Sequence, residues 1–194
     1  MIAEIFKSFI TLFIIIDPFM SVLFFISQFK NKSDKEKNKA IFTAIVVAAV
    51  LLVVFLYTGL IILNALSISF NGLKIAGGII LLLMGITTVL GIHFGGKRET
   101  VTSAAILIGT PLLSGPGALT TIIILSKDYG YTIPLIAAML VILVSYLLLK
   151  FSFVFEKLLG KDVIEICSKV LGLLLAALAV DFIYAGIKGF ILMG

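Results

Sequence analysis

The stretch Pro111-Leu112-Leu113-Ser114-Gly115-Pro116-Gly117-Ala118 interrupts an otherwise apolar run that extends over Thr102–Ser126. Two prolines and two glycines within seven residues break an α-helix, because a proline removes a backbone hydrogen bond and clashes with the preceding turn, at a cost of ~3 kcal/mol or more. The run is long enough for a membrane helix, which needs about 20 apolar residues. Unpaired backbone groups survive in lipid only inside protein or beside a wet cavity. The stretch therefore predicts a broken membrane helix at a functional position.

A second interruption, Asp17-Pro18, lies in the first apolar run, Ile5–Phe29. Aspartate is a preferred helix N-cap and proline a preferred first helical residue, so the pair predicts a new helix that starts at Pro18. Both interruptions fall about halfway along their runs, which predicts two discontinuous helices near the bilayer midplane. The alternative is a pair of packing kinks without function.

The composition of the whole chain is that of a membrane protein. Of its 194 residues 61% are apolar and 13% charged, against roughly 45–50% and about 25% in soluble domains. A chain of this length cannot bury so much apolar surface, which excludes a soluble enzyme, a disordered chain and a nucleic-acid-binding protein. We expect an all-α integral membrane protein with one domain, residues 1–194, and six transmembrane helices: Ile5–Phe29, Ala40–Leu63, Leu73–His93, Thr102–Ser126, Tyr131–Val154 and Val170–Met193.

The distribution of positive charge predicts the topology. The first, third and fifth connections carry 11 of the 15 Lys and Arg residues. By the positive-inside rule these connections are cytoplasmic and both termini are extracellular, in the plasma membrane. Ser33-Asp34-Lys35-Glu36 fits a capping box that starts the second helix before the membrane. The 11 Lys and Arg residues of the first, third and fifth connections are Lys30, Lys32, Lys35, Lys37, Lys39, Lys97, Arg98, Lys150, Lys157, Lys161 and Lys169.

The connection before the last span carries aromatic and charged residues together. Phe151, Phe153 and Leu158 accompany the lysines between Lys157 and Lys169. This mixture predicts a helix that lies at the cytoplasmic membrane surface.

An internal repeat relates the two halves of the chain. Pro18 and Pro116 are 98 positions apart, while Gly77 and Gly172, each near the start of a similar apolar run, are 95 apart. Three spans per repeat is an odd number, so the second copy must be upside down relative to the first. We therefore expect two inverted three-helix repeats, about 1–95 and 100–194, an architecture typical of secondary transporters.

The two breaks together predict a site for a small zwitterion. Each new half-helix presents unpaired N–H groups and a positive dipole end, and each preceding segment presents unpaired carbonyls. The glycines at 115 and 117 let a ligand come close to the backbone but leave little room, which favours a small ligand. The candidate substrate-binding residues are Asp17, Pro18, Phe19, Met20, Ser21, Ser114, Gly115, Pro116, Gly117 and Thr120. For Thr120 a hydrogen bond to its own backbone is the competing interpretation.

These features together resemble the MarC family. The resemblance rests on the six spans, the Asp17-Pro18 pair, the stretch that starts at Pro111, and Gly77-Gly78 and Gly172-Leu173, and it covers essentially the whole chain. It implies the activity of the family's characterised SnatA-type members, secondary transport of small neutral amino acids such as glycine and alanine.

The first repeat departs from the family pattern. Met20, Ser21 and Leu23 stand where the family usually has a glycine, a polar residue and a second proline. We therefore expect one rim of the site to be bulkier and more helical.

Two aspartates at membrane depth allow more than one role. Asp17 is a helix cap or a direct ligand and proton carrier. Asp181, in the last span, is the candidate for ion coupling or substrate contact, with a hydrogen bond to a broken helix as the alternative. We expect a proton or a sodium ion as the coupling ion, or exchange without one.

Two other classes of function compete with a transporter. One is a membrane channel or a scaffold. The other is an intramembrane aspartyl protease with Asp17 and Asp181 as a dyad, although the Gly-x-Gly-Asp signature of such enzymes is absent. We expect no enzymatic activity, and with one Cys and one His in the chain no metal centre of the usual zinc type and no cofactor.

Overall fold

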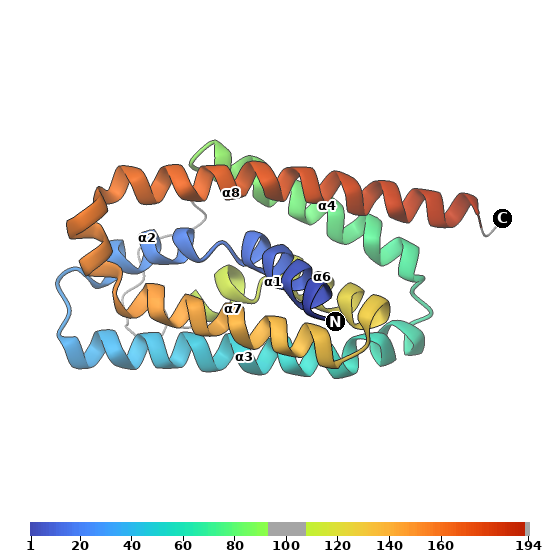
Figure 1. Ribbon diagram of the computed structural model, residues 1–194, viewed down its shortest axis with the longest axis horizontal. Helices are drawn as coiled ribbons and strands as arrows, with labels where there is room; N and C mark the ends of the chain where they lie inside the picture. The colour runs from blue at the N-terminus through green and yellow to red at the C-terminus, as the bar shows by residue number, and fades with distance from the viewer. Residues whose placement is uncertain (93–107, 193–194) are drawn as a thin grey trace.

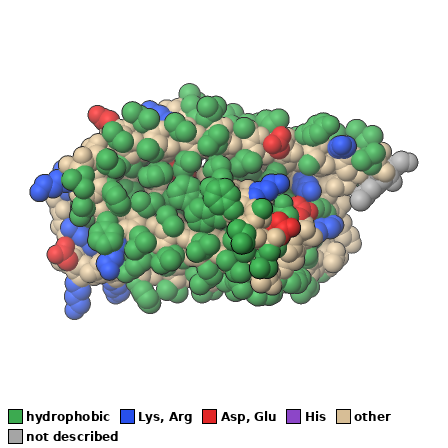
Figure 2. Space-filling model, in the orientation of Figure 1, with side chains coloured by type: hydrophobic (Ala, Val, Ile, Leu, Met, Phe, Trp, Pro, Cys, Tyr) green, Lys and Arg blue, Asp and Glu red, His purple; other side chains and the backbone are tan. Residues whose placement is uncertain are grey.

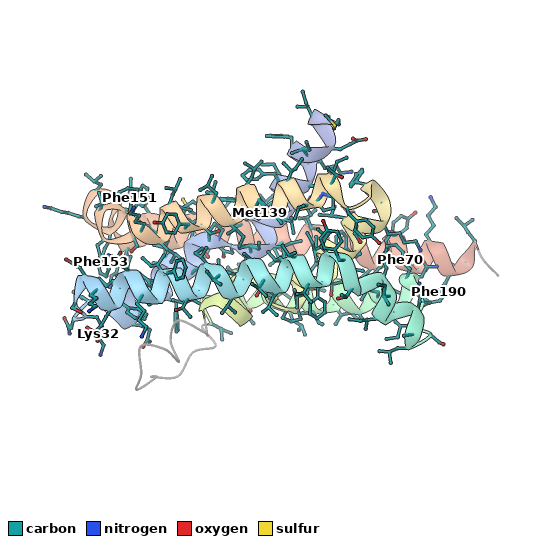
Figure 3. All side chains as sticks on the ribbon, turned by 90° about the horizontal axis from the view of Figure 1, so that it is seen from below. Lys32, Phe70, Met139, Phe151, Phe153 and Phe190 are labelled. Atoms are coloured by element: carbon teal, nitrogen blue, oxygen red, sulfur yellow. The ribbon has the colours of Figure 1, made fainter. Side chains whose placement is uncertain are left out.

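The computed structural model describes residues 1–92 and 108–192, with the backbone alone for 110–112. In these ranges the chain forms helices and no strands. Most of the helices lie side by side along one long axis, while α1 is inclined to the others and projects from the bundle at its N-terminal end (Figure 1; Figure 3). The elements are α1 (Ile2–Ile16), α2 (Pro18–Phe29), α3 (Asp34–Ala65), α4 (Phe70–Val89), η1 (Ile108–Leu113, a π-helix), α6 (Pro116–Tyr129), α7 (Thr132–Lys150) and α8 (Ser152–Ile191).

Five segments are long and apolar enough to cross a membrane: α1 with α2, α3, α4, α7 and α8. These segments confirm a multi-pass membrane protein whose described residues form helices and no strands. The sixth predicted span, Thr102–Ser126, begins in residues that lie outside the described part, and its remainder contains η1 and α6. The predicted end of the third span at His93 is also outside the described residues.

The start of α3 follows from its sequence. Ser33 is the N-cap, and its hydroxyl accepts from the Glu36 backbone N–H at 3.3 Å. The Glu36 carboxylate accepts in turn from the Ser33 backbone N–H at 2.9 Å. This reciprocal pair is the predicted capping box. It lets α3 begin six residues before the predicted membrane boundary at Ala40, so that the first turns of α3 carry the charged residues.

Glycines let α4 and α8 approach through their backbones. A Cβ added at Gly78 would stand 2.8 Å from the Ala179 carbonyl oxygen, and one at Gly85 would stand 2.8 Å from that of Gly172. As residue numbers rise along α4 they fall along α8, so the two helices are antiparallel neighbours (Figure 1). Membrane helices associate through such small residues because lipid supplies no hydrophobic force between them.

Gly160 divides α8 into a short and a long part. Its φ of 80° and ψ of 161° are not helical, and Figure 1 shows the chain turning here at one end of the bundle. From Lys161 onward α8 runs without a break to Ile191. The prediction of one surface helix over residues 157–169 is therefore wrong for residues 161–169, which belong to the long part. The hydropathy pattern missed this because the charged first turns of a long helix resemble a connection.

Basic and aromatic residues lie at both ends of the bundle. Lysines gather where α2 meets α3 (Figure 2), and Lys37 lies 4.3 Å above the ring of Phe153. Figure 3 shows Phe151 and Phe153 at the same end as Lys32, and Phe70 and Phe190 at the other. There, Lys127 lies 4.0 Å above the Phe70 ring. Aromatic and basic residues at both ends suit the interfaces of a bilayer.

Candidate functional site

Asp17 occupies the junction between α1 and α2. Its backbone is left-handed, with φ 41° and ψ 72°, and it is 7% exposed. Oδ1 accepts from the Met20 backbone N–H at 3.2 Å, so the predicted cap of α2 is present. Oδ2 accepts from the Ser168 hydroxyl of α8 at 2.5 Å. Asp17 therefore ends one helix, starts the next and ties both to α8.

The sequence did not single out Ser168, which is 1% exposed. It stands between charged residues in a segment predicted to lie at the surface. Helical periodicity could have revealed it, because Ser168 lies one turn before Gly172 and one turn after Ile164, and all three are buried. The buried face of α8 thus extends one turn further than the apolar run indicates.

The first turn of α2 holds the other predicted residues of the first break. Pro18 and Ser21 are buried, while Phe19 and Met20 are half-buried. The Phe19 ring packs edge-on against Phe13 of α1, with centroids 6.2 Å apart. The Ser21 hydroxyl is buried one turn after Asp17 and has no hydrogen-bond partner among the described residues. Ser21 therefore offers an unused polar group beside the cap.

The second break separates η1 from α6. The Ser114 hydroxyl donates to the Gly109 carbonyl at 2.6 Å. Gly115 follows with an extended backbone and is the N-cap of α6, which receives no side-chain cap from any described residue. The backbone N–H groups of the first turn of α6 therefore lack the partner that Asp17 gives to α2.

Helix α4 covers two of the predicted residues on α6. A Cβ at Gly117 would overlap the Leu81 side chain, and a Cβ at Gly77 would overlap Thr120. In this structure the space beside Gly117 is thus filled by protein. Thr121, next to Thr120, is fully buried, and its hydroxyl has no partner among the described residues. Such buried unpartnered hydroxyls are uncommon in proteins and call for an explanation.

A small pocket of about 230 Å³ lies between α3, α4 and α6. Pro116 and Thr120 line it, and Pro116 is exposed. The other lining residues are apolar: Phe55, Gly59, Ile62, Leu63, Leu73, Leu119 and Ile123. No residue of α1 or α2 reaches it. Five of the ten predicted residues lie at the first break, from Asp17 to Ser21, and two of the other five, Pro116 and Thr120, line this pocket.

The helices that flank the two breaks contact one another. α1 packs against α6, and α2 packs against η1. The two interruptions are therefore neighbours in the bundle, although they are about 98 residues apart in the chain. The two interruptions bring a buried carboxylate, an uncapped helix N-terminus and several buried hydroxyls into one region of the bundle.

Asp181 is not part of this arrangement. It is exposed on the outer face of α8. It lies 13 residues beyond Ser168, which corresponds to about 20 Å along the helix. Asp17 and Asp181 therefore do not form the dyad that an aspartyl protease needs.

A buried helical core with apolar outer faces and two adjoining helix interruptions defines a polytopic α-helical membrane protein with an internal polar site. Comparison with known proteins gives the family. Residues 2–191 match the model of the MarC family, described as integral membrane proteins, and the chain belongs to this family.

Two curated relatives are similar over nearly their whole length. The chain is 33% identical to a UPF0056 membrane protein of Archaeoglobus fulgidus, covering 94% of this chain and 91% of that one. It is 30% identical to the UPF0056 membrane protein YhcE of Escherichia coli, covering 95% and 92%. No solved structure is significantly similar to the chain.

Proposed function

We propose that this protein is a secondary active transporter of small neutral amino acids, such as glycine and alanine, that works by alternating access across the plasma membrane. The observation that carries the proposal is the contact between the segments on either side of the two breaks, α1 with α6 and α2 with η1. Irregular backbone at membrane depth is tolerated where it lines a site, and transporters place their substrates there.

The packing of α4 against α8 supports an inverted repeat. These helices carry the related landmarks Gly77 and Gly172. They lie side by side and antiparallel, as expected for equivalent helices related by an axis in the membrane plane. The proposal includes two repeats of three spans, with the interruptions at Asp17 and Gly115 as equivalent breaks near the midplane.

The polarity of the two breaks suits a zwitterion. Asp17 brings a carboxylate, which attracts the ammonium of an amino acid. The uncapped N-terminus of α6 brings N–H groups and a positive dipole end, which attract its carboxylate. The unused hydroxyls of Ser21 and Thr121 add polar partners. No fixed cation is required at the site.

The available space favours a small substrate. The pocket beside Pro116 and Thr120 holds about 230 Å³, below the roughly 300–1,000 Å³ of sites for drug-sized ligands. Leu81 and Met84 already stand against Gly117. Because this packing leaves little room, a substrate with a small side chain, such as glycine or alanine, would need the least displacement of it.

The direction of insertion and the driving ion belong to the same proposal. The lysine distribution supports a cytoplasmic α2–α3 connection and extracellular termini. A proton or sodium gradient drives accumulation, and without a gradient the carrier exchanges substrate.

Counterflow in proteoliposomes tests the proposal. Vesicles loaded with unlabelled alanine should accumulate labelled alanine transiently, with saturation, while leucine competes weakly. Asp17→Leu is the inactive control, because it removes the carboxylate and the cap. Flux that rises linearly with concentration and shows no counterflow would instead assign a channel. The absence of any flux for the twenty amino acids would leave the scaffold hypothesis.

A further inference from the structure

The pocket between α3, α4 and α6 leads towards one end of the bundle. On α6, Thr120 and Ile123 line the pocket, and Lys127 follows one turn later. On α4, Leu73 lines it, and Phe70 precedes it by one turn. Residues three or four apart share a helix face. The faces that line the pocket therefore continue to Lys127 and Phe70, which lie next to each other where the bundle ends (Figure 3).

Two ammonium groups share the ring of Phe70. Nζ of Lys127 lies 4.0 Å from the ring centroid, and Nζ of Lys74 lies 4.8 Å from it. Neither lysine forms an ion pair or a hydrogen bond with a described residue. Like charges at such short range repel each other, and a phenyl ring attracts a cation only weakly at an exposed site. The ring therefore holds two cations that the described residues do not neutralise.

The N-terminus of α4 adds positive potential at the same place. The helix begins at Phe70 and has no acidic residue in its first turn. The Ser69 hydroxyl accepts from the Gly72 backbone N–H at 3.0 Å, but it brings no charge. Lys74 comes directly after this turn, although a cation is unfavourable near the N-terminal end of a helix. An anion at this end of the pocket would balance both lysines and the helix dipole.

The pocket itself suits a hydrocarbon chain. Apart from Pro116 and Thr120, its lining is apolar. Ile62 of α3 is 41% exposed although it lines the pocket, so the described residues leave the pocket open beside α3. In a bilayer this opening faces acyl chains. An anion that is attached to a hydrocarbon chain fits both parts, whereas a free inorganic anion would leave the apolar part empty.

We propose that this pocket binds an anionic phospholipid of the adjoining leaflet, with its phosphate at Lys74 and Lys127 and an acyl chain between α3 and α4. Basic residues near a membrane surface attract anionic lipids, and the pocket below them selects a lipid over a soluble anion. This inference does not depend on the transport proposal. The lipid enters at the end near Phe70 and does not require the inner end, which Pro116 and Thr120 form.

Quenching by brominated lipids tests the site. The chain contains no tryptophan, so Ile62→Trp reports on the pocket alone. The matched control is Ile136→Trp on α7, because Ile136 is 40% exposed and also lies about one turn from the end of its helix. In phosphatidylcholine proteoliposomes, a minor fraction of brominated phosphatidylglycerol should quench Ile62→Trp about twofold or more beyond brominated phosphatidylcholine. Ile136→Trp should be quenched equally by both lipids.

Lysine substitutions in the Ile62→Trp protein test the headgroup contact. Lys74→Gln and Lys127→Gln should each lower the preference for phosphatidylglycerol about two- to fivefold, since one basic residue near the surface is worth about fivefold in affinity. Lys74→Arg and Lys127→Arg keep the charge and should retain the preference. Lys188→Gln is the control, because it removes an exposed lysine of α8 close to Phe190 at the same end of the bundle (Figure 3).

A soluble anion is the competing occupant. Inorganic phosphate at millimolar concentration should not change the excess quenching, compared with sodium chloride of equal ionic strength, because phosphate has no chain to fill the pocket. Loss of the excess in phosphate would assign a site for soluble anions and overturn the lipid. Equal quenching of Ile62→Trp by both lipids, or an excess that survives the loss of both lysines, would overturn it as well.

Discussion

The Ser168 hydroxyl donates a hydrogen bond to Oδ2 of Asp17 across 151 residues of sequence. The other carboxylate oxygen caps α2. One side chain thus sets the end of α1, the start of α2 and the position of α8 beside them. In the proposed transporter, a movement of α8 away from α1 and α2 would have to break this bond.

Removing the Ser168 hydroxyl should destabilise the protein. Ser168→Ala leaves a buried carboxylate oxygen without its donor, which costs about 1–3 kcal/mol. We expect a lower unfolding temperature in detergent and reduced alanine uptake. Ser145→Ala is the matched control, because Ser145 is also fully buried but bonds only the Val141 carbonyl of its own helix. Equal losses in both variants would contradict a special role for Ser168.

The cap and the charge of Asp17 can be separated. Asn caps helices as well as Asp and tolerates positive φ, so Asp17→Asn should keep most of the stability. Asp17→Leu should cost about 0.5–2 kcal/mol from the lost cap, plus strain at φ 41°. If the carboxylate binds the substrate ammonium, Asp17→Asn should raise KM for alanine while leaving the unfolding temperature nearly unchanged. An Asp17→Asn carrier with normal KM would limit Asp17 to capping.

A compensating pair tests the contact between α4 and α6. Gly117→Ala introduces a methyl group that overlaps Leu81, so it should lower stability by about 1–3 kcal/mol through overpacking. Leu81→Ala alone should also destabilise, because it leaves a cavity. The double variant Gly117→Ala with Leu81→Ala should recover part of the loss in unfolding temperature. Additive losses would show that the two residues do not oppose each other.

Local chemistry made the helix boundaries predictable. Ser33 and Asp17 cap helices through bonds to residues three positions ahead, so the sequence alone contains both partners. The same holds for the apolar spans, since length and hydropathy decide whether a helix can cross a bilayer.

The orientation of each membrane helix about its axis was not predictable in this way. Hydropathy gives the depth of Asp181 in its span but not the face on which it lies, because both the protein interior and the lipid are apolar. Ser168 shows the same limit. Its partner is far away in the chain, and the charged residues around it concealed the buried face of α8. Gly117 was expected to permit a close approach of the ligand, and in this structure its neighbour is Leu81.

Accessibility labelling tests the topology. In a Cys167→Ser background, an impermeant thiol reagent should label Asp128→Cys in intact cells, because this exposed residue lies at the end of the bundle that we assign to the outside. Ser33→Cys, at the opposite end, should react only after the membrane is permeabilised. The reverse pattern would invert the assignment of both termini.

The backbone contact between α4 and α8 has a consequence for the synthesis of the protein. The glycines of α4 that receive α8, Gly78 and Gly85 among them, belong to the first half of the chain, whereas α8 leaves the ribosome only after α7. Until then the glycine groove of α4 faces lipid, which cannot pack against it as closely as a helix does. The first half therefore waits in the bilayer as an unfinished intermediate, and its folding ends only after α8 has been inserted. Ribosomal stalling before α8 would expose that groove to the cell's membrane proteases.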